Sequence, residues 1–260
     1  MGERPEAMTD QDHRVCAAIT ATPDQWDQQN TTYAIRAEAA LPELVGHPHL
    51  YLDGEGGTHV ELVSGNPELI IKEEDGMLRL HMEPRASAQQ RVAVLREAPG
   101  RLRLIRFAAI HRQLGAILGD SLAVPVQARD RVREVIAPLT GNVSVQSDIG
   151  SMEAGTTVVA ADETIHVHLL PAGAGLQVQL YVQPFGEAGP AYVPGRGGST
   201  VVAALQQQRL EVARDLPEER RRAHAVAAAC SVLRSEEHPP ELPSPHTRPD
   251  AVLCSKKKIH

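Results

Sequence analysis

The residues that come closest to a binding pattern lie in the segment RLRLIRF, residues 101–107. Arg101, Arg103 and Arg106 alternate with apolar residues, and Phe107 follows them directly. On a strand, guanidinium groups at this spacing can contact phosphates while an aromatic ring stacks on a base. The pattern predicts a nucleic-acid contact at Arg101, Arg103, Arg106 and Phe107. The alternative is an outer strand face in water, because charged residues often flank the edges of sheets.

A glycine-rich segment, PGRGGST at 194–200, resembles a phosphate-binding loop in composition. A nucleotide-binding loop follows GxxxxGK[ST] and leads into a helix, because its lysine must reach the terminal phosphates. Here Gly198 is followed by Ser199, and the chain continues as the apolar run VVAAL. We therefore interpret the segment as a turn or an inter-strand loop.

Two pairs of histidines raise the question of a metal site. His166 and His168 would share one face of a strand, and His47 and His49 are also two residues apart. A third ligand at metal-like spacing is missing from both pairs, so we expect hydrogen-bonded or solvated histidines. Cys230 lies on an apolar helical stripe and is interpreted as a core residue rather than a nucleophile. No metal ion and no other cofactor is expected.

The chain has 260 residues, of which 42% are hydrophobic, and a formal net charge of −7. No run of 18 apolar residues occurs, and the first residues do not resemble a secretory signal. The cysteines are three in number and widely spaced, which argues against a disulfide framework. These features predict a soluble cytoplasmic protein with no membrane contact.

The charges are unevenly distributed along the chain. Residues 1–75 contain 4 basic and 15 acidic side chains, a balance of −11, whereas residues 79–112 contain eight arginines and two glutamates, a balance of +6. A globally basic nucleic-acid-binding domain is therefore not indicated. The stretch 79–112 is called the basic zone below.

Periodicity divides the chain into helices and strands. Apolar residues at helical spacing predict helices at 15–22, 33–44, 108–118 and about 126–137, the last stopping near Pro138. Between 49 and 107 the period is 2, which predicts an antiparallel meander with a hairpin at Asp75 and Gly76. A second β region is expected from Asn142 to about Val202. On the strand at 101–107, some of the arginines should lie on one solvated face.

The clearest helix signal starts at Asp215. Asp215 and Glu218 form an Asp-x-x-Glu capping box, Pro217 stands in the first turn, and an apolar stripe follows at 223, 226, 230 and 233. The sequence thus predicts an α+β fold with antiparallel β-rich sheets, short amphipathic helices and a C-terminal helix. Residues 1–234 form this region, with a subdivision near residue 140 as an alternative, and the proline-rich residues 235–260 are expected to be a disordered tail.

Seven segments together resemble one family, the region that precedes the motor in large bacterial Swi/Snf-type DEAD/DEAH-box helicases. They cover most of residues 35–234 and occur in the family's order. Gln183 departs from the pattern, which has an arginine before Pro184, so any contact made by that arginine is in doubt here. The segments are RAEAALPELVGHPHLYL (36–52), VELVSGNPELII (60–71), REAPGRLRLIRF (96–107), LGDSLAVP (118–125), VQSDIG (145–150), VQPFGEAGPAYVPGRGG (182–198) and RDLPEER (214–220).

The resemblance implies part of an ATP-driven machine directed at DNA or RNA, with its motor C-terminal to this region. The sequence has neither a GKT or GKS loop nor a DExH or DExD pair, so we do not expect this chain to be an enzyme. The leading hypothesis is a non-catalytic accessory region, truncated or frameshifted before the motor, that packs on a helicase motor or positions nucleic acid. The alternative is a stand-alone protein-interaction module without nucleic-acid binding. The oligomeric state is left open.

Overall fold

The structure, a computed structural model, describes residues 8–23, 31–52, 57–98, 100–152, 155–172, 175–205 and 208–229. The helices within these ranges are α1 (Asp10–Ala17), α2 (Ala37–Glu43), α3 (Ala109–Leu118), α4 (Arg129–Ile136) and α5 (Leu216–Ala229), with short 3-10 turns at Val126–Ala128 and Ala137–Gly141. The strands are β1 (Ile19–Pro23), β2 (Thr31–Ile35), β3 (Tyr51–Leu52), β4 (Thr58–His59), β5 (Glu61–Gly65), β6 (Glu68–Glu74), β7 (Met77–Glu83), β8 (Val92–Ala98), β9 (Arg101–Arg106), β10 (Leu122–Pro125), β11 (Ser144–Ser147), β12 (Thr157–Val158), β13 (His166–Ala172), β14 (Gly175–Tyr181), β15 (Thr200–Leu205) and β16 (Gln208–Ala213). The predicted α+β class is confirmed.

The largest sheet has seven strands in the order β10-β7-β6-β11-β15-β16-β12. Its β6–β7 hairpin turns at Asp75 and Gly76, both with positive φ, as the sequence predicted. The sheet joins strands from both sides of residue 140, because β6 lies beside β11 in parallel. Most of the other pairs are antiparallel.

The prediction of one antiparallel meander between 49 and 107 is wrong, because only the separate hairpins β3–β4, β6–β7 and β8–β9 are antiparallel neighbours and they belong to three different sheets. β8 and β9 leave the large sheet and form a three-stranded sheet with β5, in which β5 and β9 run parallel. Alternation along a strand specifies which side chains share a face, but it does not specify the neighbouring strand. The sequence pattern therefore could not distinguish a meander from two sheets.

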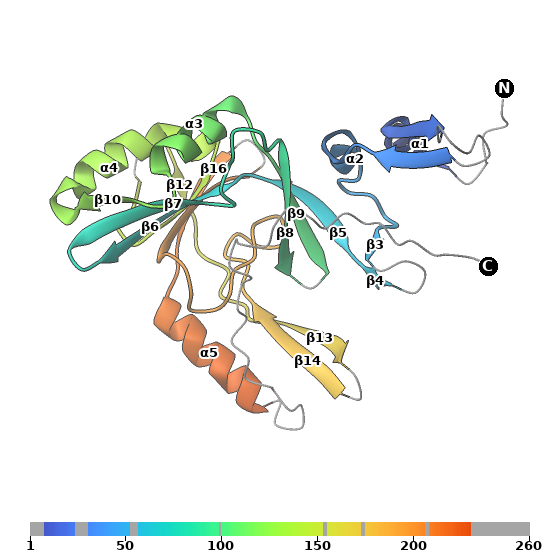
Figure 1. Ribbon diagram of the computed structural model, residues 1–260. Helices are drawn as coiled ribbons and strands as arrows, with labels where there is room; N and C mark the ends of the chain where they lie inside the picture. Colours follow the sequence, from blue (N-terminus) through green and yellow to red (C-terminus); the bar gives the residue numbers. More distant parts are fainter. Residues whose placement is uncertain are drawn as a thin grey trace.

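The main core lies between one face of the large sheet and the helices α3 and α4, which cover it (Figure 1). Leu69 and Ile71 of β6 point into this layer, and Leu118 of α3 and Ile136 of α4 meet them from the other side. A smaller apolar cluster on the second side of the fold contains Val182, Tyr192, Val201 and Val212. The long connection from Val182 to Ser199 belongs to this second side.

The N-terminal segments differ from the two helices predicted there. Helix α1 ends at Ala17, and β1 then pairs antiparallel with β2. We expected Ile19 and Tyr33 on helical stripes, but both lie in this sheet. Ile19 of β1 pairs with Ile35 of β2, and Tyr33 of β2 pairs with Ala21 of β1. Threonines and isoleucine are stiff at χ1 and favour strands, so local β propensity overrides the apparent helical spacing. The second helix is confirmed only from Ala37 to Glu43.

The later helices match their predicted positions. Helix α3 ends directly before Gly119, and α4 lies within the range 126–137. At the start of α5, the backbone N–H of Glu218 donates to Asp215 Oδ1 at 2.9 Å, which is the predicted N-cap. Cys230 and the predicted tail at 235–260 lie outside the described residues. Of the helices in the described ranges, none has the length and apolarity needed to cross a membrane.

Candidate functional site

The four residues predicted to contact nucleic acid differ in burial and do not form one exposed surface. Arg103 is buried, with 7% of its surface exposed, and Phe107 is buried in the main core. Arg101 is largely covered, and its Nη1 donates to the backbone oxygen of Glu187 at 2.8 Å. Arg106 is exposed. Phe107 is thus not presented to a base, and Arg103 does not lie on a solvated face.

Arg103 is held by two carboxylates and lies within a buried polar cluster. Its Nη1 donates to Glu68 Oε1 of β6 at 2.7 Å, and its Nε donates to Glu97 Oε1 of β8 at 2.8 Å. The second oxygen of Glu68 accepts from Gln146 Nε2 of β11 at 2.5 Å. Glu97 also accepts from the backbone N–H of Ala191 at 3.1 Å. Each charge is therefore matched by a partner, as buried ionic groups require.

A second ion pair continues this cluster at the start of α5. Arg214 Nη2 donates to Glu219 Oε2 at 2.7 Å, and its Nη1 donates to the backbone oxygen of Arg196 at 2.9 Å. Glu219 also accepts from the backbone N–H of Gly195 at 2.8 Å. The Arg214 guanidinium lies over the ring of Tyr192, 4.9 Å from its centroid, which is a cation–π contact. We call Glu68, Glu97, Arg103, Gln146, Tyr192, Arg214 and Glu219 the polar cluster.

Burial and neighbouring charges shift the pKa of two members of the polar cluster, Arg103 and Tyr192. Burial alone disfavours the charged form of Arg103, but the carboxylates of Glu68 and Glu97 more than offset it and raise the pKa of the guanidinium. For Tyr192, burial is the largest cause and Glu68 adds to it, so the pKa of the phenol is raised well above 10.0. The Tyr192 hydroxyl is buried without a hydrogen-bond partner. Arg103 and Tyr192 therefore keep their charge states near neutral pH, and neither is poised to transfer a proton there.

The glycine-rich segment packs tightly against β11 in place of forming a phosphate loop. Gly198 N–H donates to Gln146 Oε1 at 3.3 Å. A Cβ at Gly197 would overlap the Gln146 side chain, and one at Gly198 would overlap the backbone of Ser147. Glycine is thus needed for close approach of two backbones. The interpretation as an inter-strand loop agrees with this position, between Val182 and β15.

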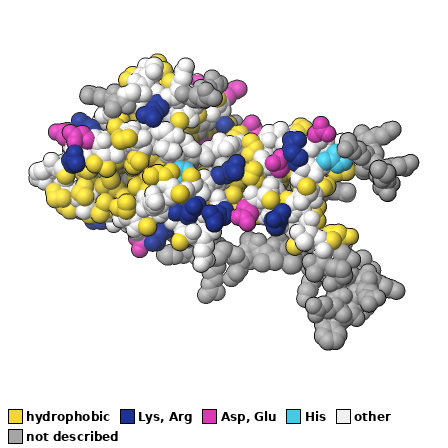
Figure 2. Space-filling view, turned by 90° about the horizontal axis from the view of Figure 1, so that it is seen from above, with side chains coloured by type: hydrophobic (Ala, Val, Ile, Leu, Met, Phe, Trp, Pro, Cys, Tyr) yellow, Lys and Arg dark blue, Asp and Glu magenta, His cyan; other side chains and the backbone are white. Residues whose placement is uncertain are grey.

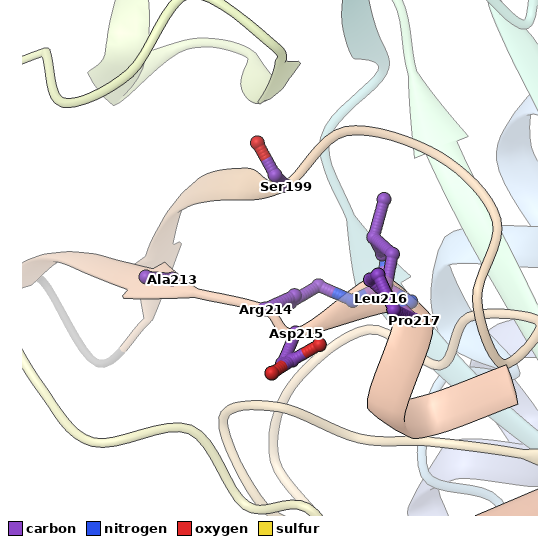
Figure 3. Close-up of a pocket in the computed structure, with 6 residues that line it drawn as sticks. All are labelled: Ser199, Ala213, Arg214, Asp215, Leu216 and Pro217. Atoms are coloured by element: carbon purple, nitrogen blue, oxygen red, sulfur yellow. The ribbon is translucent and has the colours of Figure 1, made fainter. Parts of the chain in front are cut away.

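A hollow of about 400 Å³ lies beside the polar cluster, at the start of α5. It is lined by Ser199, Ala213, Arg214, Asp215, Leu216 and Pro217 (Figure 3). In this view the Ser199 hydroxyl and the Asp215 carboxylate point in opposite directions. The Arg214 guanidinium is bound to Glu219, and Asp215 caps α5. The lining groups therefore do not converge on a point where a substrate could react.

Of the paired histidines, His47 and His166 contact protein side chains, but the buried Nε2 of His166 has no hydrogen-bond partner, so the expected hydrogen bond is not found there. His166 stacks on Tyr181 across the β13–β14 hairpin, with centroids 5.0 Å apart. His47 Nε2 lies 2.8 Å from Asp12 Oδ1, next to α1. Hydrogen bonds from Thr9 are the main cause that lowers the pKa of Asp12 from its ordinary 3.8 to about 2, and His47 contributes. In the described ranges, no three His, Cys, Asp or Glu side chains group as metal ligands.

Much of the basic zone is engaged within the protein. Arg79 pairs with Glu74 and Arg85 with Asp120, both at the surface. Figure 2 shows Lys and Arg side chains as separate spots, and it shows hydrophobic side chains gathered over the end of the molecule that carries α3, α4 and β10. Exposed apolar residues on these elements are Ile117, Leu122 and Val135. The charge balance of +6 in the basic zone therefore does not appear as one continuous basic patch on the face shown.

Sequence reasoning missed the polar cluster because its members are far apart along the chain. Glu68 and Gln146 are separated by 78 residues, and Arg103 and Glu68 by 35. The available signal was that Arg103 shares a strand face with the apolar Ile105, and an arginine on a buried face requires a partner. Comparison of the chain with protein-family models, with curated proteins and with solved structures finds no match.

Proposed function

We propose that this chain is a non-catalytic accessory region of a Swi/Snf-type ATP-dependent helicase, which packs on the motor or positions nucleic acid for it. The supporting observation is that five of the seven segments with family resemblance meet in the polar cluster. They supply Glu68, Glu97 with Arg103, Gln146, Tyr192 and Arg214 with Glu219. The five segments that resemble the family therefore contact one another in the fold. Together they join two sheets, the loop before β15 and α5.

The polar cluster supports an architectural role over a catalytic one. Its carboxylates and guanidinium groups bind one another, and its two arginines, Arg103 and Arg214, are buried, with 7% and 5% of their surfaces exposed. Catalytic groups, in contrast, need access to a substrate and a pKa near the working pH. A rigid module beside a motor needs neither of these properties and requires only a fixed internal geometry, which the buried ion pairs provide.

The test combines the purified chain with the two-lobed motor of a Swi/Snf-type helicase. Size-exclusion chromatography should show a complex, and ATP hydrolysis should appear only when the motor is present. Nucleic-acid binding is measured in parallel, with single-stranded and double-stranded DNA and RNA at low and high salt. Absence of both a complex and salt-sensitive binding would refute the accessory role.

A second candidate function, a stand-alone protein-interaction module, is favoured by two small sheets. In β1–β2 the register places Ile19 opposite Ile35, with 36% and 59% of their surfaces exposed. In β13–β14 Val167 and Leu169 are 44% and 49% exposed. Exposed apolar faces of this kind often bind other proteins. Self-association or partner binding without any effect of a helicase motor would support this function.

A further inference from the structure

A groove runs between the segment 85–88 and the outer side of α3. It has a volume of about 590 Å³ and is lined by Arg85, Ala86, Ser87, Ala88, Ala109, Arg112, Gln113, Gly115 and Ala116. We call it the α3 groove. A Cβ at Gly115 would lie 2.9 Å from the backbone oxygen of Ala86, so glycine brings helix and segment together at the floor. Small side chains thus leave room for side chains of another molecule.

The outer face of α3 is unusually poor in charge. The exposed residues Ala109, Gln113, Ala116 and Ile117 follow helical spacing, and Ile117 is 70% exposed. A helix that covers a core on one side normally carries charged residues on the other. Helix α4, which covers the same sheet face, does so, with the exposed pair Arg131 and Glu134. The outer face of α3 is therefore the one with the composition of a covered surface.

The charged groups that line the α3 groove are both basic. Arg112 Nη1 donates to the backbone oxygen of Phe107 at 2.6 Å, and a guanidinium has further N–H groups to offer. Arg85 pairs with Asp120, but both side chains are mostly exposed, at 58% and 87%. Exposed pairs of this kind contribute little, so an incoming carboxylate can replace Asp120. Charge complementarity thus favours an occupant with acidic side chains.

We propose that the α3 groove docks an acidic amphipathic segment of a partner protein. Its apolar side chains lie on Ala88, Ala109 and Ala116, and its carboxylates pair with Arg85 and Arg112. Nucleic acid fits less well, because the nearby ring of Phe107 is buried, and the exposed aromatic residues in the described ranges, Tyr33 and Tyr51, belong to the N-terminal segments.

This inference rests on the packing role in the proposed function, but its test uses no helicase motor. If the chain binds the peptide described below but forms no motor complex, the helicase connection is lost and the α3 groove is kept. If the chain forms a motor complex but ignores the peptide, the α3 groove is lost instead.

The test measures fluorescence anisotropy of a labelled peptide of about 16 residues, with Leu and Ala on one helical face and Glu beside them, added to the full chain. A matched peptide with Lys in place of Glu and an oligothymidine of about 20 nucleotides are the comparison probes. The variants are Arg85→Glu, which reverses one charge, and Ala116→Trp, which fills the α3 groove without changing charge. Arg131→Glu on α4 is the control, and thermal unfolding verifies the fold of each variant.

We expect salt-sensitive binding of the acidic peptide only, weakened about tenfold by each groove variant and unchanged by the control. Both changed positions are exposed, and if one variant fails to fold the other decides. Equal binding of the lysine peptide, no binding of the acidic peptide, or binding that neither variant weakens would overturn the proposal. Displacement of the acidic peptide by oligothymidine would also overturn it and assign the surface to nucleic acid.

Discussion

The polar cluster and the outer surface of α4 contain the same chemical pairs in different surroundings. Arg103 and Glu68 are about nine-tenths buried, whereas Arg131 and Glu134 are 77% and 66% exposed at a similar separation of 2.8 Å. Water screens the exposed pair and offers each group alternative partners, so the pair contributes little. The buried groups have no such alternative. Position relative to water, and not the kind of pair, therefore decides which ions the fold depends on.

The same difference in burial separates the charged groups that stabilise the fold from those that can bind a ligand. The buried pairs join β6, β8, β9, β11 and α5, and they leave no charge free for a ligand. The α3 groove shows the opposite arrangement, with guanidinium groups at the surface and small apolar residues between them. We thus expect substitutions in the polar cluster to change stability, and substitutions in the α3 groove to change binding.

The largest effect is expected for Arg103→Ala. It leaves Glu68 and Glu97 buried without their cation, which should lower the free energy of unfolding by about 3 to 5 kcal/mol. Urea unfolding followed by circular dichroism measures the change. Arg106→Ala, three residues further along β9 and exposed, is the matched control and should leave the stability nearly unchanged. Equal stability of both variants would break the comparison.

A smaller loss is expected for Gly198→Ala. The new methyl group would overlap the backbone of Ser147, so the loop must shift away from β11, at about 1 to 3 kcal/mol. Gly100→Ala is the control, since its Cβ would meet neighbours only at 3.8 Å and beyond. The midpoint of urea unfolding should fall for the first variant and hold for the second.

Removal of the α5 cap by Asp215→Ala should lower the free energy of unfolding by about 1 kcal/mol, because the N–H of Glu218 loses its acceptor. Asp215→Ser retains an acceptor oxygen and should restore most of the loss. Thermal unfolding of both variants decides this, and identical midpoints would show that the cap at Asp215 does not stabilise the chain.

Thr9 caps α1 by accepting from the backbone N–H of Asp12, and the Asp12 carboxylate accepts from the backbone N–H of Thr9 in return. This cap predicts a pH dependence confined to the N-terminal segments. The pKa of Asp12 is lowered to about 2 in the folded chain, chiefly by Thr9. The cap therefore stabilises α1 fully above the ordinary pKa of 3.8, and this contribution is lost as the pH falls through about 2. An NMR titration of the Asp12 carboxyl carbon measures the midpoint. Thr9→Ala should move it upward toward 3.8, and an unmoved midpoint would contradict the assigned cause.

The smallest effect is expected for Arg131→Ala. This change removes the exposed pair with Glu134 and should alter the free energy of unfolding by less than about 0.5 kcal/mol. Urea unfolding in parallel with Arg103→Ala provides the sharpest comparison between buried and exposed pairs. A loss comparable with that of Arg103→Ala would show that surface ion pairs matter in this fold.

Local signals in the sequence predicted the elements that depend on nearby residues. The turn at Asp75 and Gly76, the end of α3 before Gly119 and the cap of α5 at Asp215 each involve contacts within a few residues. The parallel pairing of β6 with β11 joins residues more than 70 positions apart, and no local rule specifies it. Local rules also could not predict the candidate site, because its members are far apart in the sequence. Arg103 was predicted to contact nucleic acid, but it is buried against Glu68 and Glu97, and Glu68 is brought beside it only by the fold.

The long separations within the polar cluster impose an order on the folding of the chain while it is synthesised. The ribosome releases Glu68 35 residues before Arg103 and 78 residues before Gln146. Until then the β6–β7 hairpin can form, but Glu68 must remain hydrated and the face that carries it stays open. The second side of the sheet thus closes late, when β11 and the loop before β15 have emerged. We therefore expect nascent chains of this protein to pass through a stage at which one half of the future core is exposed, and chaperones bind exposed apolar surface of this kind.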